Sequence, residues 1–155
     1  MVVRYLPFFA TSPIKMLNFE YSSSRDAELL ASCLPLCSRT LKQLCFERDT
    51  SLEGEDRNAA SIIVSKAMCT LESLTSLSIT YPHQETLVHL GSLIYLRHLD
   101  LTLPEGGHNL PASFQALETL NLRYTTWDAA SVINFLQCIH PRNLTHLRIS
   151  RDCLH

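Results

Sequence analysis

Apolar residues recur along the chain in the spacing Leu-x-x-Leu-x-Leu, which is present in six copies. In each copy, one residue separates the last two apolar residues. This alternation is expected of a short strand with one buried face. The copies are Ile14-Leu17-Phe19, Leu41-Leu44-Phe46, Leu74-Leu77-Ile79, Leu96-Leu99-Leu101, Leu117-Leu120-Leu122 and Leu144-Leu147-Ile149. Their central residues are 27, 33, 22, 21 and 27 positions apart. Because one strand cannot bury its apolar face alone, the copies are predicted to stack on one another.

Segments of helical periodicity lie between these strands. Ser23, followed by Asp26, predicts the start of a helix that ends before Pro35. A second helix is predicted for residues 56–68, and elements of one or two turns for residues 85–90 and 112–116. A last helix is predicted from Thr126 or Asp128 to Pro141. The expected apolar faces are Leu29, Leu30, Cys33 and Leu34 in the first helix, Ala59, Ala60, Ile63 and Ala67 in the second, and Ala129, Val132, Ile133, Leu136 and Ile139 in the last.

The predicted fold is an α/β leucine-rich-repeat solenoid, because most repeat lengths fall in the range of that architecture. Parallel strands are expected on its concave face, with helices or short turns on its convex face. Residues 1–155 are interpreted as a single domain of about six irregular repeats. Residues 1–10 are interpreted as part of a preceding repeat, and Ile149 lies six residues before the end. Solenoids need polar caps, so this one is expected to be incomplete at both ends.

Composition favours a soluble domain that binds neither nucleic acid nor membranes. The chain is 46% hydrophobic and 18% charged, with a net charge of −2, and it has no general electrostatic attraction to anionic polymers or surfaces. No run approaches the roughly 20 apolar residues that cross a bilayer. Cysteines beside apolar positions typically pack as small core residues with free thiols. Free thiols favour a reducing compartment, the cytoplasm or the nucleus.

The search for catalytic or metal chemistry gives weak candidates. Gly106-Gly107 lacks the spacing of a phosphate-binding loop. His98 and Asp100 share a strand face, but an exposed polar surface is the preferred interpretation. Five potential zinc ligands lie near the end of the chain, but they lack the close pairs typical of structural zinc sites. They are Cys138, His140, His146, Cys153 and His155. The pair Cys33 and Cys37 is interpreted as core packing. We therefore expect no enzymatic activity, no cofactor and no metal.

Polar positions between the buried strand residues form three predicted rows on the concave face. Glu20 and Glu47 make one end acidic, whereas Arg123, His146 and Arg148 make the other end basic. Such a gradient favours a protein partner of complementary polarity. The alternative is that strand faces of any solenoid are polar and that these charges segregate by chance. The predicted partner-binding residues are Glu20, Glu47, His98, Asp100, Asn121, Arg123, His146 and Arg148.

The segment Thr40-Leu41-Lys42-Gln43-Leu44-Cys45-Phe46 and the run from Leu71 to Leu122 resemble the leucine-rich-repeat portion of fungal F-box-like proteins. The resemblance implies recognition of a protein substrate for a ubiquitin ligase. The 155 residues contain no F-box, so a cullin-RING ligase adaptor is a partner only if an F-box lies outside this chain. The asparagine that the family often places after each strand is absent, since these positions hold Ser22, Asp49, Pro82, Pro104, Thr125 and Asp152. The alternatives are a stand-alone scaffold, an inhibitor-like binding protein and a truncated fragment without independent activity.

Overall fold

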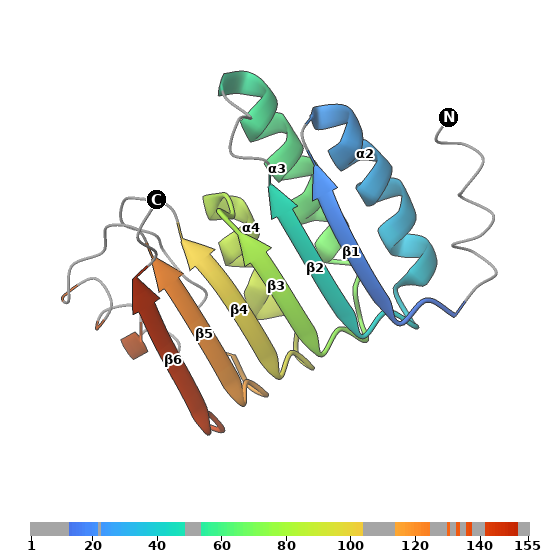
Figure 1. Cartoon of the computed structure of the whole chain (residues 1–155). Helices are drawn as coiled ribbons and strands as arrows, with labels where there is room; N and C mark the ends of the chain where they lie inside the picture. The colour runs from blue at the N-terminus through green and yellow to red at the C-terminus, as the bar shows by residue number, and fades with distance from the viewer. Residues whose placement is uncertain are drawn as a thin grey trace.

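A computed structural model describes residues 13–21, 23–48, 54–103, 114–124, 130, 133, 136–137 and 142–151. Within these ranges, six parallel strands form one sheet in which spatial order follows chain order (Figure 1). The strands are β1 (Met16–Tyr21), β2 (Gln43–Arg48), β3 (Ser76–Thr80), β4 (His98–Leu103), β5 (Thr119–Tyr124) and β6 (His146–Arg151). Each strand coincides with one copy of the apolar repeat, so the predicted strands are confirmed.

The helices lie on one side of this sheet (Figure 1). They are α2 (Ser24–Cys33), continued by the 3₁₀ helix η2 (Leu34–Cys37), then α3 (Gly54–Met68), and α4 (Gln84–His89), continued by the 3₁₀ helix η3 (Leu90–Ser92). Helix α3 packs between α2 and α4. The chain therefore has an α/β fold of two layers, as predicted.

One backbone hydrogen-bond pattern recurs at every step from strand to strand. The N–H groups of Lys42 and Gln43 donate to the carbonyl of Lys15 at 2.8 and 2.9 Å. The next four copies repeat this arrangement, with the carbonyls of Lys42, Thr75, Arg97 and Glu118 as acceptors. The pattern fixes the register just before each strand from β2 to β6 begins. Register matters because a slip of one residue would turn every apolar side chain of a strand away from the core.

The core lies between the sheet and the helices. The central leucines of four adjacent strands are at most 1% exposed, and these are Leu44, Leu77, Leu99 and Leu120. They form one cluster with helix residues such as Leu30, Val64 and Leu87. Burying each such side chain contributes roughly 1.5–3 kcal/mol, so the repeated leucines stabilise the packing of the helices on the sheet.

The last copy of the repeat departs from the prediction that its strand leucines enter the core. Leu147 is 46% exposed and Ile149 is 38% exposed, although both occupy the core-facing rows beside Leu120 and Leu122. Within the described part of the chain, β6 pairs only with β5. The side chains of an edge strand have neighbours on one side only, which explains their exposure.

Helix α2 follows its prediction closely. The Ser23 hydroxyl accepts a hydrogen bond from the N–H of Asp26 at 3.2 Å, so Ser23 is the N-cap. The helix ends at Cys33, and Pro35 lies in the first turn of η2, where its missing N–H costs nothing. Three of the four expected core residues are buried and Leu29 is half-buried.

Helix α3 begins two residues earlier than predicted and presents a different face. Ala59 is exposed and Ile63 is only half-buried, so the predicted buried face is wrong in these two positions. The buried side is formed by Ala60, Val64, Ser65, Ala67 and Met68. The adjacent alanines at 59 and 60 do not indicate which side of the helix faces the core. The burial of Val64 and Met68 decides which side does.

The other predicted helices have mixed outcomes. The short element at residues 85–90 is present as α4 and the start of η3. Residues 114–116 form no helix, and residues 112–113 lie outside the described ranges. Of the last predicted helix, Ala130, Ile133, Leu136 and Gln137 are helical, and its other residues lie outside the description. Ile133 is 53% exposed, so its predicted place in the core is wrong. Residues 1–10 and Gly106-Gly107 also lie outside the described ranges.

A buried hydroxyl on β4 predicts a stabilising substitution. Thr102 is 3% exposed, and its Oγ1 has no hydrogen-bond partner among the described residues. Because an unpartnered buried hydroxyl costs about 1–3 kcal/mol, Thr102→Val is expected to raise the free energy of unfolding by about 1 kcal/mol. Urea denaturation measures this change. The control is Thr86→Val, which removes a hydroxyl bonded to Ser65 at 2.6 Å and should be destabilising. A less stable Thr102→Val protein would contradict the prediction.

Two buried thiols predict how stability depends on pH. Burial raises the pKa of Cys33 and Cys37, and for Cys33 the neighbouring Cys37 raises it further. The folded state therefore retains these protons at a pH where unfolded thiols, with a pKa of about 8.5, ionise. The free energy of unfolding is expected to be unaffected by these groups below about pH 8.5 and to fall above it.

Urea denaturation at pH 7 to 10 measures this loss of stability. The double variant Cys33→Ala with Cys37→Ala is expected to show a shallower decline, whereas the exposed Cys69→Ala control should match the unchanged protein. Equal slopes for the double variant and the unchanged protein would show that the buried thiols do not cause the decline.

Candidate partner-binding face

The face of the sheet opposite α2, α3 and α4, here called the polar face, carries the predicted rows of side chains. The strand register places their members side by side. The first row is Met16, Gln43, Ser76, His98, Thr119 and His146. The second row is Asn18, Cys45, Ser78, Asp100, Asn121 and Arg148. The third consists of Glu20 beside Glu47, and of Thr80, Thr102, Arg123 and Ser150.

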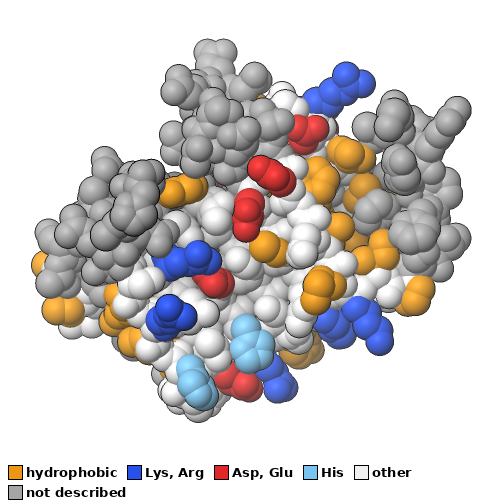
Figure 2. All heavy atoms as spheres, viewed as in Figure 1, with side chains coloured by type: hydrophobic (Ala, Val, Ile, Leu, Met, Phe, Trp, Pro, Cys, Tyr) orange, Lys and Arg blue, Asp and Glu red, His pale blue; other side chains and the backbone are white. Residues whose placement is uncertain are grey.

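The eight predicted partner-binding residues all lie on this face, in two groups. Glu20 and Glu47 are paired across β1 and β2, whereas the other six residues lie on β4, β5 and β6. In Figure 2, acidic side chains gather toward β1 and β2, and basic side chains lie over β5 and β6. Further cations lie at the edge where the strands begin. Glu20 and Glu47 therefore lie at one end of the face, and Arg123, His146 and Arg148 lie at the other. The role of these charges in binding stays a prediction.

Asp100 and Arg123 form an ion pair that the sequence analysis missed. Nη2 of Arg123 lies 2.8 Å from Oδ1 of Asp100, and Nε donates to the same oxygen at 3.2 Å. The charge of Arg123 is therefore neutralised locally, which corrects the predicted basic end. Asp100 faces Asn121, and Arg123 lies one step further along the same side of β5. Opposite charges at such diagonal positions were the signal in the sequence.

The ion pair orients Arg123 but adds little stability. The side chains of Arg123 and Asp100 are 40% and 30% exposed, and ion pairs with this access to water contribute roughly 0–1 kcal/mol. A carboxylate that holds Nε and Nη2 of a guanidinium restricts the movement of the arginine side chain. The Asp100–Arg123 pair therefore holds the Arg123 side chain in one orientation on the polar face.

Arg148 lies beside the Asp100–Arg123 pair, and its guanidinium group is unpaired among the described residues. Its side chain is exposed and makes no ion pair or hydrogen bond with any described residue. Arg148 is the register neighbour of Asn121. A depression of about 240 Å³ lies between them, lined by Asp100, Asn121, Arg123, Arg148 and Ser150. This volume can hold a polar group together with part of the segment that carries it, and an arginine and an amide are available to donate hydrogen bonds.

The acidic end has the opposite character. Glu20 and Glu47 are exposed, occupy directly opposed positions on adjacent strands, and have no partner among the described residues. Like charges opposed in this way destabilise a sheet. The arrangement therefore favours a bound cation, which would relieve the repulsion.

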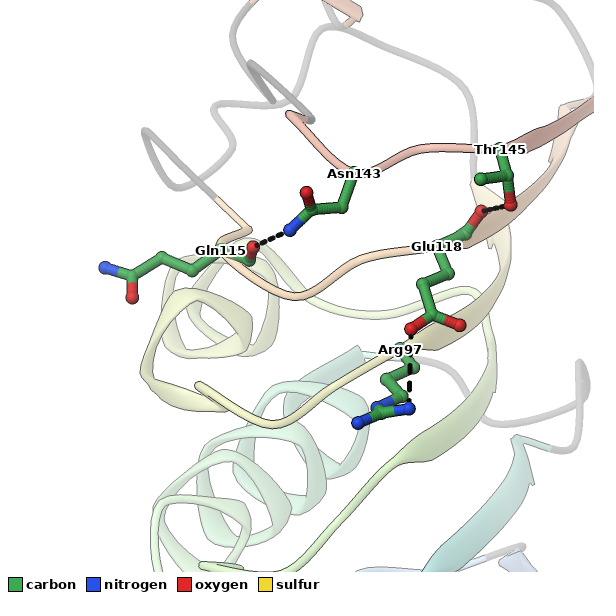
Figure 3. A network of polar contacts seen from close by, with 5 residues as sticks. All are labelled: Arg97, Gln115, Glu118, Asn143 and Thr145. Atoms are coloured by element: carbon green, nitrogen blue, oxygen red, sulfur yellow. Dashed lines mark hydrogen bonds and ion pairs between the residues drawn. The ribbon is translucent and has the colours of Figure 1, made fainter.

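The edge where the strands begin is braced by side chains (Figure 3). Asn143 donates to the carbonyl of Gln115 at 2.9 Å, and the Thr145 hydroxyl donates to the carbonyl of Glu118 at 3.1 Å. Nη1 of Arg97 lies 3.4 Å from Oε1 of Glu118. These contacts hold the turns before β4, β5 and β6 at fixed spacing, and so hold the rows of the polar face in place.

Metal and membrane chemistry gain no support from the described residues. Within the ranges that the structure describes, no three potential ligands among histidines, cysteines and carboxylates lie close enough to share an ion. Of the weighed zinc donors, His146 is exposed with Nδ1 2.9 Å from the Thr145 hydroxyl, and Cys138, His140, Cys153 and His155 lie outside the description. The described helices include none with the length and apolar character needed to span a membrane.

Comparison of the chain with known protein families, characterised proteins and solved structures finds no match.

Proposed function

We propose that the chain is a leucine-rich-repeat solenoid that binds a protein on its polar face. The repeat spacing, the parallel strands in chain order and the recurring hydrogen bond before each strand support this architecture. Neighbour-to-neighbour stacking of this kind is typical of solenoids, which use an extended sheet face for binding.

The observation that carries the proposal is the arrangement of unpaired charge on the polar face. Unpaired carboxylates lie over β1 and β2, and the unpaired guanidinium of Arg148 lies over β6. The nearer carboxylate, that of Glu47 on β2, is four strand spacings from Arg148, or about 19 Å at the usual spacing of about 4.8 Å. One small molecule does not reach both groups, whereas a protein segment does.

The resemblance to fungal F-box-like proteins supports a more specific proposal. The bound protein would be a substrate selected for ubiquitination, and an F-box elsewhere would dock on the ligase. The described cysteines Cys33, Cys37, Cys45 and Cys69 are free, which is in keeping with the reducing cytoplasm or nucleus where such ligases act.

Site-specific photocrosslinking tests the proposal. A photoreactive amino acid at Ser78, in the middle row of the polar face, is expected to crosslink a discrete protein in source cells. The matched control replaces Glu28, an exposed residue of α2 on the helical side, and should not crosslink that protein. Mass spectrometry then identifies the captured protein.

The outcomes separate the candidate functions. A substrate captured together with a cullin-RING adaptor supports ubiquitin-ligase recognition, and a partner without ligase components supports a stand-alone scaffold or inhibitor. Equal capture from Ser78 and Glu28, or no capture from either, would contradict binding at the polar face and favour an inactive fragment.

A further inference from the structure

We infer that the polar face recognises an extended peptide segment that crosses the strands, with a carboxylate bound at Arg148 and a cation bound between Glu20 and Glu47. The inference rests on the proposed function, since it specifies which protein segment that face holds. It follows from the charges, the depression and the spacing of the strands.

A carboxylate fits the depression beside Arg148 better than a phosphate group does. Two arginines and one aspartate line it, which gives a local charge of +1. A carboxylate, with charge −1, balances this site, whereas a phosphate of charge near −2 would lie against Asp100 without full compensation. Guanidinium groups bind carboxylates through two parallel hydrogen bonds. Arg148 is free to make this contact, and the Asn121 amide at the neighbouring position can donate another hydrogen bond.

The other end of the face suits a lysine or arginine of the same segment. The exposed carboxylates of Glu20 and Glu47 lie on adjacent strands about 4.8 Å apart, so one cation can contact both. Binding there would replace a repulsion between like charges with two attractions. A neutral or acidic residue would leave the repulsion in place.

The first part of the path from Glu47 to Arg148 leaves room for the segment. Cys45 on β2 and Ser78 on β3 are small, uncharged and half-buried in the middle row, so neither blocks the segment before it reaches the Asp100–Arg123 pair on β4 and β5. The distance from Glu47 to Arg148, four strand spacings and two residues along the strand direction, is about 20 Å. An extended chain covers about 3.3 Å per residue, so about six residues separate the bound cation from the bound carboxylate.

Selection from a displayed library of short random peptides, with the full chain as target, tests this inference. Enriched peptides are expected to carry an acidic and a basic residue about six positions apart. Selection with Arg148→Glu should remove the preference for the acidic residue, and selection with Glu20→Lys and Glu47→Lys should remove the preference for the basic one. Lys66→Glu changes an exposed charge on α3 and serves as the control that should leave the selected pattern unchanged.

Fluorescence anisotropy of one selected peptide gives the magnitude. Binding to Arg148→Gln is expected to weaken by about tenfold relative to the unchanged protein, and binding to Lys66→Gln should not change. A version of the peptide with phosphoserine in place of its acidic residue should bind no more tightly. Tighter binding of that version would overturn the preference for a carboxylate.

The result can fail independently of the proposed function. If Ser78 crosslinks a discrete partner but the enriched peptides show no paired charges, the polar face binds protein and the inferred segment is wrong. If no peptide is enriched and Ser78 captures nothing, both the inference and the proposed function are wrong.

Discussion

Leu99→Ala is expected to lower the free energy of unfolding by about 2–5 kcal/mol, the usual cost of truncating a buried leucine. Leu99 is 1% exposed and lies on β4, with buried leucines on both neighbouring strands. Removing its side chain leaves a cavity that the stacked strands cannot close without shifting their register. Because domains of this size are usually stable by only about 5–15 kcal/mol, the variant should unfold at clearly lower urea concentration.

The repeat supplies a matched control at the same row of the sheet. Leu147 is the equivalent residue on β6 and is 46% exposed, so Leu147→Ala should cost less than about 1 kcal/mol. Circular dichroism during urea unfolding measures both variants. If Leu99→Ala unfolds at the same urea concentration as the unchanged protein, Leu99 is not part of the core. Equal losses of unfolding free energy in both variants would contradict the exposure of Leu147 on β6.

Arg148→Glu is expected to weaken binding of the crosslinked partner by about ten- to a hundredfold, or about 1.4–2.8 kcal/mol. The substitution removes the unpaired cation beside Asn121 and places a carboxylate where the partner's carboxylate should lie. Its effect on folding should be small, because Arg148 is exposed and without a partner among the described residues. Titration calorimetry measures the affinity, and the loss should shrink at high salt, which screens exposed charges.

Lys66→Glu makes the same change in net charge on the helical side and controls for nonspecific electrostatics. It should leave the affinity unchanged. Arg123→Glu is a less informative choice, because it would also place a carboxylate against Asp100 and disturb the ion pair. A partner that binds equally well to Arg148→Glu and to the unchanged protein does not use the basic end of the polar face.

The structure refines the electrostatic picture of the sequence in one important respect. The sequence counts Arg123 and Arg148 as equivalent cations, but only Arg148 remains unpaired in the described structure. Asp100 holds the Arg123 side chain in place and neutralises its charge. The basic end is therefore a site for a single negative charge, and this conclusion decides which ligands the face should prefer.

The sequence alone determined the strands, their order and the rows of the polar face. Alternation of apolar and polar residues has a period of two, and a strand has the same period, so each repeat specifies which side chains face the core. Repetition of the unit then specifies the register, because aligned copies bury their leucines together. This is why the positions of Glu20, Asp100 and Arg148 on one face followed from spacing.

Only the tertiary structure decided the properties that depend on neighbours distant in the chain. The Asp100–Arg123 pair requires side-chain geometry across two strands, and the exposure of Leu147 depends on its place in β6, which pairs with β5 alone among the described strands. The rotation of α3 was set by the packing of Val64 and Met68, not by its weak local pattern. A local pattern fixes which way a residue points, whereas burial and pairing depend on what the rest of the fold places opposite it.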